Sequence, residues 1–122
     1  MMLRIKDIVK NFGGIKAVNE CTFDVEENTI TSLIGPNGAG KTTLFNIISG
    51  LIKSDKGSIK LQKNDITNMQ PYKIARLGIS RTFQMTKVFR NMSIKDNLLL
   101  AKKTDEEEIK KILDSVYLHK PL

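Results

Sequence analysis

The sequence predicts an α/β fold, and three observations support this prediction. Residues 3–9 alternate apolar with polar side chains, as a strand with one buried face does. Residues 29–34 are almost all β-branched or apolar, and a glycine-rich loop follows them directly. From residue 93 onward the apolar residues recur at helical spacing. Strands therefore come first, a mixed region follows, and helices come last, with no repeat and no linker between them.

The strands expected from the pattern lie at 3–9, 22–25, 29–34, 57–61 and 78–83. Paired glycines in the "NFGG" stretch at 11–14 favour a turn after the first strand, because glycine relieves the backbone strain of reversing direction. The strand at 29–34 should be buried on both faces, since apolar residues occupy consecutive positions.

The helices expected from the pattern lie at 41–49, 71–77, 93–101 and 105–118. Proline at position 71 falls in the first turn of its helix, where a missing amide costs least. Ser93 is a suitable N-cap for the third helix. Acidic residues fill the first turn of the last helix, and its apolar residues form one stripe.

The composition limits the possible functions. No apolar run is long enough to cross a bilayer, and the N-terminus lacks the core of a signal peptide, so we expect a cytoplasmic protein. The single cysteine, Cys21, excludes an internal disulfide and is expected to be a buried structural thiol. The net charge of +7 comes from scattered basic residues without interleaved aromatics, which argues against a nucleic-acid partner.

The stretch "GPNGAGKT" at 35–42 matches the phosphate-binding pattern G-x-x-x-x-G-K-[ST] at every position. Its context also fits, because an apolar run precedes it and an amphipathic helix follows it. Gly35, Gly38 and Gly40 allow the backbone to wrap closely and to point successive N–H groups inward. The amides and dipole at the start of the helix add further attraction for phosphate. The alternative is a glycine-rich turn that happens to contain a lysine, and it does not explain why every position of the pattern is matched in this context.

The polar residues that end this loop have distinct expected roles. Lys41 would reach the β- and γ-phosphates, the Thr42 hydroxyl would hold Mg²⁺, and Thr43 would approach the α-phosphate. The expected nucleotide-binding residues of the loop are Gly35, Asn37, Gly38, Ala39, Gly40, Lys41, Thr42 and Thr43. The sequence therefore predicts a P-loop protein that binds a nucleotide with Mg²⁺.

The longer stretch "GPNGAGKTTL" resembles the Walker A motif of the ATP-binding cassette (ABC) transporter ATPases. "VKNFGGIKAV" is similar to the family's A-loop segment, in which an aromatic residue stacks on adenine. The resemblance implies that Phe12 stacks on the base and that Val18 is a second adenine contact. Without the resemblance, the sequence around Phe12 fits an aromatic residue packed at a turn equally well.

"GISRTFQ" resembles the strand that leads to the family's Q-loop, and this places the Q-loop glutamine at Gln84. In the family that glutamine reaches toward Mg²⁺ and the attacking water. The resemblance thus makes Gln84 and Lys41 the catalytic residues and Thr42 and Gln84 the metal ligands, although a lone glutamine after a strand is usually only a polar loop residue.

The stretches "FGGIKAV", "ARLGISRTFQ" and "VFRNMSIKDNLLLA" together are similar to the ATPase subunit of branched-chain amino acid importers. This resemblance implies an ATPase that couples ATP binding and hydrolysis to transport. It implies membrane-spanning permease subunits and a second ATPase subunit as partners, and a peripheral position on the inner face of the cell membrane.

The chain also departs from the family pattern. It has no run of four apolar residues followed by Asp and Glu, no L-S-G-G-Q signature, and only His119, near its end, in place of the switch histidine. We therefore expect residues 1–92 to form the N-terminal part of the ABC core, an antiparallel β subdomain plus the P-loop core. Residues 93–122 would begin the helical subdomain, truncated before the signature motif.

The missing motifs bear on activity. Without a carboxylate to orient water, we expect the chain alone not to hydrolyse ATP. The alternative to a transport ATPase is a nucleotide-binding module without catalysis, or a truncated remnant. A small GTPase or kinase is disfavoured, because the sequence has no N-K-x-D motif and no cluster of lid arginines. The strand at 29–34 would also have unpaired edges in this chain.

Overall fold

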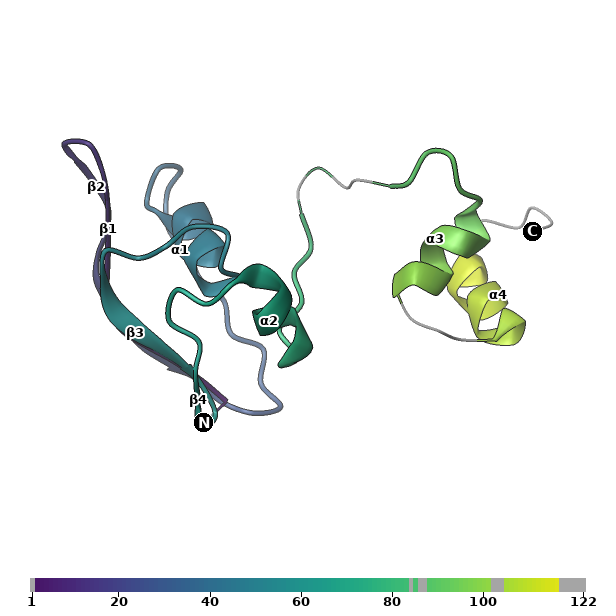
Figure 1. Cartoon of the computed structure of the whole chain (residues 1–122), viewed down its shortest axis with the longest axis horizontal. Coiled ribbons are helices and arrows are strands. Elements are labelled where there is room, and N and C mark those ends of the chain that lie inside the picture. The colour runs from purple at the N-terminus through teal and green to yellow at the C-terminus, as the bar shows by residue number, and fades with distance from the viewer. Residues whose placement is uncertain (1, 84, 86–87, 102–104, 117–122) are drawn as a thin grey trace. The chain divides into compact units, whose positions relative to one another are not determined.

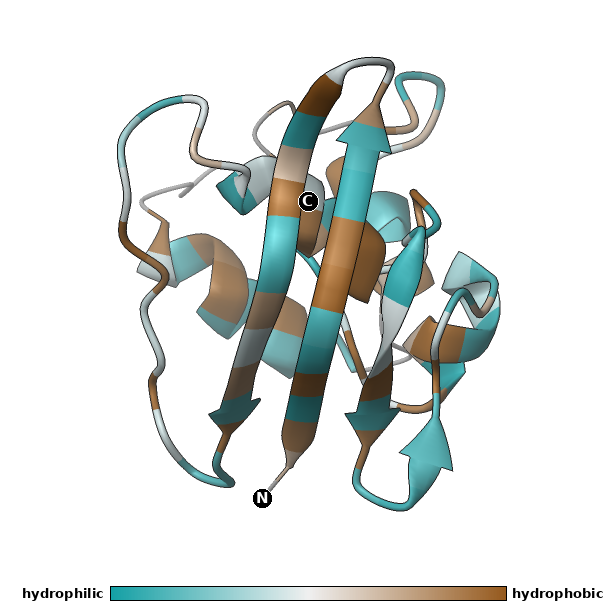
Figure 2. Cartoon of the chain, turned by 90° about the vertical axis from the view of Figure 1, so that its left-hand side faces the viewer, coloured by the Kyte–Doolittle hydropathy of each residue, from teal (hydrophilic) through white to brown (hydrophobic). Residues whose placement is uncertain are grey.

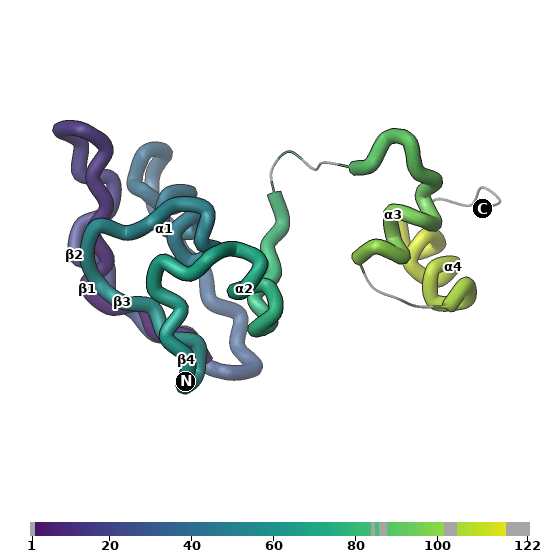
Figure 3. The backbone as a smooth tube through the Cα atoms, viewed as in Figure 1, coloured from purple at the N-terminus to yellow at the C-terminus, as the bar shows by residue number. Residues whose placement is uncertain are grey.

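The computed structural model describes residues 2–83, 85, 88–101 and 105–116. These residues form two compact units, Met1–Arg81 and Thr82–Leu122. The described part of the first unit contains a four-stranded sheet with helices α1 (Lys41–Ile48) and α2 (Pro71–Arg76). The second contains helices α3 (Ile94–Ala101) and α4 (Glu106–Ser115). Figures 1 and 3 trace each unit from its first to its last element.

The sheet of the first unit is antiparallel and has the order β2-β1-β3-β4. Its strands are β1 (Leu3–Phe12), β2 (Ile15–Val25), β3 (Lys56–Leu61) and β4 (Asn64–Asp65). Strands β1 and β2 form a long hairpin, in which Leu3 pairs with Val25 at one end and Phe12 with Ile15 at the other. The expected strands at 3–9, 22–25 and 57–61 are therefore confirmed, and the hairpin is longer than expected.

The tip of this hairpin is open. It turns at Gly13 and Gly14, as the paired glycines predict, and Gly13 has a φ of 56°. A Cβ added at either glycine would meet nothing within 4 Å. The tip therefore has room around it, and only Gly13 has a backbone conformation that favours glycine.

Strand β1 carries a bulge that resets its buried face. The register of its pairing with β2 shifts between Ile5 and Ile8, and Asp7 between them has a φ of 53°. Thr22 on β2 holds the bulge: its Oγ1 accepts from the Asp7 backbone N–H at 2.8 Å and donates to Asp7 Oδ1 at 3.0 Å. The extra residue lets Ile5 and Ile8, three positions apart, both face the core.

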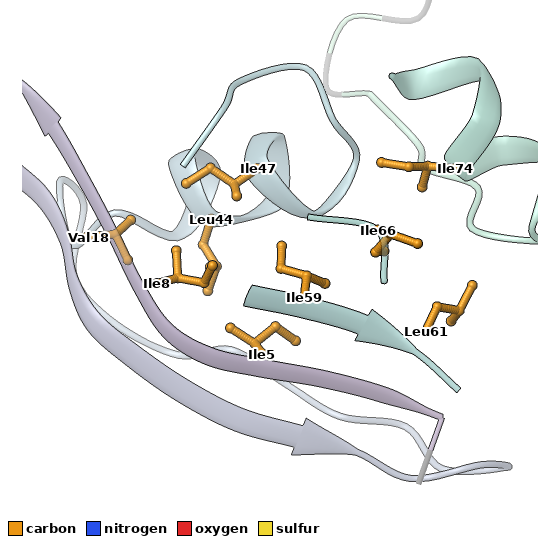
Figure 4. Close-up of a cluster of buried hydrophobic side chains, with 9 residues drawn as sticks. All are labelled: Ile5, Ile8, Val18, Leu44, Ile47, Ile59, Leu61, Ile66 and Ile74. Carbon is orange, nitrogen blue, oxygen red and sulfur yellow. The ribbon is translucent and has the colours of Figure 1, made fainter. Parts of the chain in front are cut away.

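Helices α1 and α2 cover one face of the sheet, and the core of the first unit lies between them and the strands (Figure 4). Along β1 and β2, hydrophobic and hydrophilic residues alternate in bands (Figure 2). The buried cluster consists of Ile5, Ile8, Val18, Leu44, Ile47, Ile59, Leu61, Ile66 and Ile74. This core fixes α1, and with it the glycine-rich loop, against the hairpin.

Two of the expected strands are absent. Residues 29–34 and 78–83 form no strand, and the expectation that 29–34 is buried on both faces is wrong: Ile30 is 100% and Ile34 is 91% exposed. An isolated extended segment gains no ladder of hydrogen bonds, and no strand in the described part of the chain pairs with this one. The apolar run is suited to a sheet interior, but no strand among the described residues pairs with it to form one.

The helices of the second unit begin at side-chain caps. Ser93 Oγ accepts from the Asp96 backbone N–H at 3.0 Å before α3, as predicted. Asp105 Oδ1 accepts from the Glu108 backbone N–H at 2.8 Å before α4. Helix α4 ends at Ser115, before the expected end at 118, which lies outside the described residues, as does His119.

Two further expectations concern Cys21 and the membrane. Cys21 is half-buried beside the core cluster, and burial raises the pKa of its thiol. It is thus less buried than predicted, although it does pack against the core. Among the described helices, none has the length and apolar character needed to span a bilayer.

Candidate functional site

The glycine-rich loop at 35–40 leads directly into α1, as the motif predicts. Gly40 is the N-cap residue of this helix, with a φ of 86°, and Gly38 has a φ of 84°. Both values are in the left-handed region, which glycine adopts without strain. The first turn of α1 contains no acidic side chain. Its free amides and its dipole therefore give the start of the helix a positive potential that favours anions.

Lys41 folds back onto the loop that precedes it. Its Nζ donates to the carbonyl oxygen of Pro36 at 2.7 Å and also to that of Gly35. The Ala39 backbone N–H donates to the Pro36 carbonyl at 3.2 Å and closes a turn within the loop. The loop backbone thus holds the ammonium group beside the start of α1, and two sources of positive potential coincide there.

Gly40 also joins the loop to the hairpin. A Cβ added at Gly40 would lie 2.1 Å from the carbonyl oxygen of Ala17 and 3.5 Å from Cγ2 of Val18, both on β2. Only glycine allows so close an approach of two backbones. Val18 itself is buried, with 7% exposure, so it offers little surface to a ligand. The expected adenine contact therefore lies beneath the loop.

Phe12 lies at the end of β1, on the hairpin that Gly40 touches, and it is 47% exposed. The Nζ atom of Lys10 lies 5.4 Å from the centroid of the Phe12 ring. Lys10 also forms an ion pair with Asp55, with 2.9 Å between Nζ and Oδ1. With 47% of the residue exposed, Phe12 is not packed into the core.

The other predicted residues of the loop are accessible to different degrees. Asn37, Ala39 and Thr42 are exposed, while Gly35 and Thr43 are partly buried. The structure thus brings the predicted residues of 35–43 together around the start of α1. Gln84 lies outside the described residues.

The segment before Gln84 is tied to α1 by Arg81. Its Nη1 donates to Asn46 Oδ1 at 2.5 Å and to Ser49 Oγ at 3.2 Å. Sequence reasoning missed this contact, and it also missed those of Lys10, Ala17 and Asp55. Only one of these carried a local signal: Lys10 and Phe12 are two positions apart, which in a strand places them on the same face.

An α/β unit in which a lysine-bearing glycine loop opens onto the start of a helix defines a P-loop nucleotide-binding protein. Residues 18–121 match the family model described as ABC transporter. This match covers most of the chain, and the chain belongs to the ABC transporter family. The P-loop fold class and the family predicted from the motifs are thereby confirmed.

Curated relatives share more than 40% of the aligned residues. The probable branched-chain amino acid transport ATP-binding protein LivG of Archaeoglobus fulgidus is 44% identical over 100 residues, which are 82% of this chain and 39% of the relative. The high-affinity branched-chain amino acid transport ATP-binding protein BraF of Pseudomonas aeruginosa is 43% identical with the same coverage. The chain thus spans about 39% of the length of these relatives.

Solved structures of ATP-binding cassettes also resemble this chain and are also longer than it. A nucleotide-free ATP-binding cassette from an ABC transporter is 34% identical, with a TM-score of 0.70, and the match covers 96% of this chain and 54% of that one. The ADP conformation of the cassette MJ1267 matches with a TM-score of 0.71 at the same identity and coverage. The chain therefore has the fold of one part of such a cassette.

Proposed function

We propose that this chain is the nucleotide-binding part of an ABC importer ATPase and that it binds ATP at the loop 35–43. One observation carries the proposal: the Lys41 ammonium is held by the loop carbonyls of Gly35 and Pro36 beside the free amides of α1. A polyphosphate would receive donors from the loop backbone, from the helix start and from the lysine.

Different residues of the loop would contact different phosphates of ATP. Lys41 would contact the β- and γ-phosphates, while backbone amides of Gly35, Asn37, Gly38, Ala39 and Gly40 would surround them. Thr43 would approach the α-phosphate. These roles follow from the spacing of the motif and from the accessibility of the loop.

The residues present also fit Mg²⁺ bound together with ATP. The Thr42 hydroxyl is exposed in the first turn of α1, and the described residues contain no cluster of His, Cys, Asp or Glu that would hold a metal alone. Thr42 would hold Mg²⁺, which when bound offsets part of the phosphate charge. Gln84 is proposed as a second ligand, which in a complete ATPase would also reach toward the attacking water.

The adenine base would lie against Phe12. Phe12 is about half-exposed at the end of the hairpin that touches Gly40, which suits a stacking platform next to the phosphates. Val18 belongs to the same region, but its side chain packs beneath the loop, so its part would be to support Gly40 beside the base.

The transport role rests on the relatives. The names of LivG and BraF describe ATP-binding proteins of branched-chain amino acid transport, and we propose the same substrate class for the system to which this chain belongs. Permease subunits, a second ATPase subunit and a position at the inner face of the cell membrane are part of this proposal. Residues 1–92 would supply the core and 93–122 the start of the helical subdomain.

Binding without hydrolysis is the activity proposed for the chain by itself. The sequence contains no Walker B run and no signature motif, so no carboxylate of that kind is present to orient water. A nucleotide-binding module without catalysis is thus the second candidate function, and both candidates share the same site.

The test is calorimetric titration of the chain with Mg-ATP, with phosphate release followed in the same samples. Lys41→Ala should weaken binding about 10- to 100-fold, since a hydrogen bond to a charged group is lost. Lys63→Ala is the matched control, because it removes an exposed lysine in the turn between β3 and β4. Equal affinity of Lys41→Ala and the parent chain would overturn the proposal, and lysine-dependent phosphate release would exclude the non-catalytic module.

A further inference from the structure

The Asp55 carboxylate accepts hydrogen bonds from residues at the end of β1. Its Oδ1 accepts from Lys10 Nζ at 2.9 Å, and its Oδ2 accepts from the Asn11 backbone N–H at 2.7 Å and from Asn11 Nδ2 at 3.4 Å. The Asp55 backbone N–H in turn donates to the Val9 carbonyl at 2.8 Å. A single residue, just before β3, therefore fixes three consecutive positions that lead to Phe12.

Lys10 connects this carboxylate to the aromatic ring. Its Nζ lies 5.4 Å from the centroid of Phe12, and its side chain is only 15% exposed. A cation at this distance is attracted to the face of an aromatic ring. Since the ammonium is also paired with Asp55, it cannot move away from the ring without losing a charged hydrogen bond. The ring is thus held from one side, while 47% of the residue remains exposed.

We propose that Asp55 and Lys10 are positioning residues that hold Phe12 in the orientation needed to stack on a purine base. Neither residue touches the nucleotide: Asp55 orients Lys10 and the backbone of Asn11, and Lys10 orients the ring. This inference rests on the proposed function, because it concerns the base-binding half of the same site. It specifies what distinguishes a nucleotide from any other polyphosphate at this loop.

A purely structural ion pair would behave differently from a positioning one. If the pair only stabilises the end of the strand, its loss affects every ligand of the loop alike. If it positions the ring, its loss affects ATP and spares a ligand that has no base. Inorganic tripolyphosphate with Mg²⁺ is such a ligand, since it offers the phosphates alone.

The experiment compares the dissociation constants of Mg-ATP and Mg-tripolyphosphate for the parent chain, Phe12→Ala, Asp55→Asn, Lys10→Met and Lys10→Arg. Phe12→Ala should weaken ATP binding about tenfold, the effect of losing one base–aromatic stack. Asp55→Asn and Lys10→Met should weaken it about 3- to 10-fold and leave tripolyphosphate binding unchanged. Lys10→Arg keeps a cation over the ring and a partner for Asp55, so it should retain the preference of the parent chain for ATP over tripolyphosphate.

A matched control lies at the other end of the same hairpin. Arg4 and Asp24 form a pair with 3.0 Å between Nε and Oδ1, on β1 and β2 but far along the strands from Phe12. Asp24→Asn removes this pair and should leave the preference for ATP over tripolyphosphate unchanged. In a Phe12→Ala background, Asp55→Asn should have no further effect on ATP, because the ring that it positions is gone.

The outcomes separate the two proposals. Lys41-dependent ATP binding, with Asp55→Asn weakening ATP and tripolyphosphate equally, overturns the positioning role and leaves the proposed function standing. A loss of ATP preference in Asp24→Asn also overturns the positioning role. The preference would then depend on any ion pair of the hairpin and not on the pair beside Phe12. If ATP binding by the parent chain does not depend on Lys41, the proposed function fails and this inference fails with it.

Discussion

Gly40 lies so close to the carbonyl oxygen of Ala17 that a Cβ in its place would be 2.1 Å from that oxygen. Gly40→Ala should therefore move the loop off the hairpin, lower the free energy of unfolding by about 1–3 kcal/mol and abolish ATP binding. Denaturant unfolding and ATP titration measure the two effects. Gly14→Ala, at the open hairpin tip without a positive φ, should change neither. An unchanged unfolding midpoint for Gly40→Ala would contradict the contact.

The contrast between Ile47 and Ile30 tests which apolar residues form the core. Ile47 is 2% exposed and Ile30 is 100% exposed. Ile47→Ala should lower the free energy of unfolding by about 2–5 kcal/mol, whereas Ile30→Ala should change it by less than about 0.5 kcal/mol. Urea denaturation followed by circular dichroism gives both values. A large loss for Ile30→Ala would show that the segment 29–34 is buried in solution.

The contact of Arg81 with Asn46 should be measurable as a coupling energy. Arg81→Ala and Asn46→Ala each remove one partner of the 2.5 Å hydrogen bond between Nη1 and Oδ1. A double-mutant cycle on unfolding free energies should give a coupling of about 1 kcal/mol or more, because one partner is charged. Additive effects of the two substitutions would contradict the hydrogen bond between Arg81 and Asn46.

Asp55 should contribute stability only above acid pH. Hydrogen bonds from the Asn11 backbone and from Lys10 lower the pKa of the Asp55 carboxyl below its usual value. A lowered folded-state pKa stabilises the fold at pH values above the ordinary carboxyl pKa of roughly 4, and this contribution is lost as the pH falls through the folded-state pKa. The difference in Tm between the parent chain and Asp55→Asn should thus be positive at neutral pH and should shrink in acid. A difference that is constant from neutral to acid pH would contradict the charged pairing.

The cap of α4 offers a test in the second unit. Asp105→Ala removes the acceptor of the Glu108 backbone N–H and should cost about 1 kcal/mol of helix stability. Asp105→Asn keeps a side-chain oxygen and should retain most of the cap. Far-ultraviolet circular dichroism during thermal unfolding compares the two variants. Equal loss of helix in both would indicate that charge, rather than the hydrogen bond, is what Asp105 supplies.

Local signals predicted the phosphate loop and the helices well. The G-x-x-x-x-G-K-[ST] pattern requires a loop followed by a helix within a few residues, and the structure has α1 beginning at Lys41. The predicted cap at Ser93 depends on a bond that reaches only three residues along the chain. Such features are set by neighbouring residues, so one sequence is enough to find them.

Features that join distant residues were missed. Residues 29–34 have the composition of a buried strand, but a strand needs a partner, and composition does not reveal whether one is present. Lys10 and Asp55 are separated by 45 positions in the sequence, and neither carries a local signal of the other. The contacts of Asp55 with the end of β1 therefore became visible only in the folded unit.

The open hairpin tip makes the base-binding region accessible to a chemical reporter. Gly14 lies two residues from Phe12, has space around it and needs no unusual backbone conformation. A cysteine introduced there would be exposed, whereas the native Cys21 is half-buried and burial raises the pKa of its thiol. Since the thiolate is the reactive form, a maleimide fluorophore would label Gly14→Cys faster than Cys21. The emission of that dye would then follow the arrival of a ligand at Phe12 in real time.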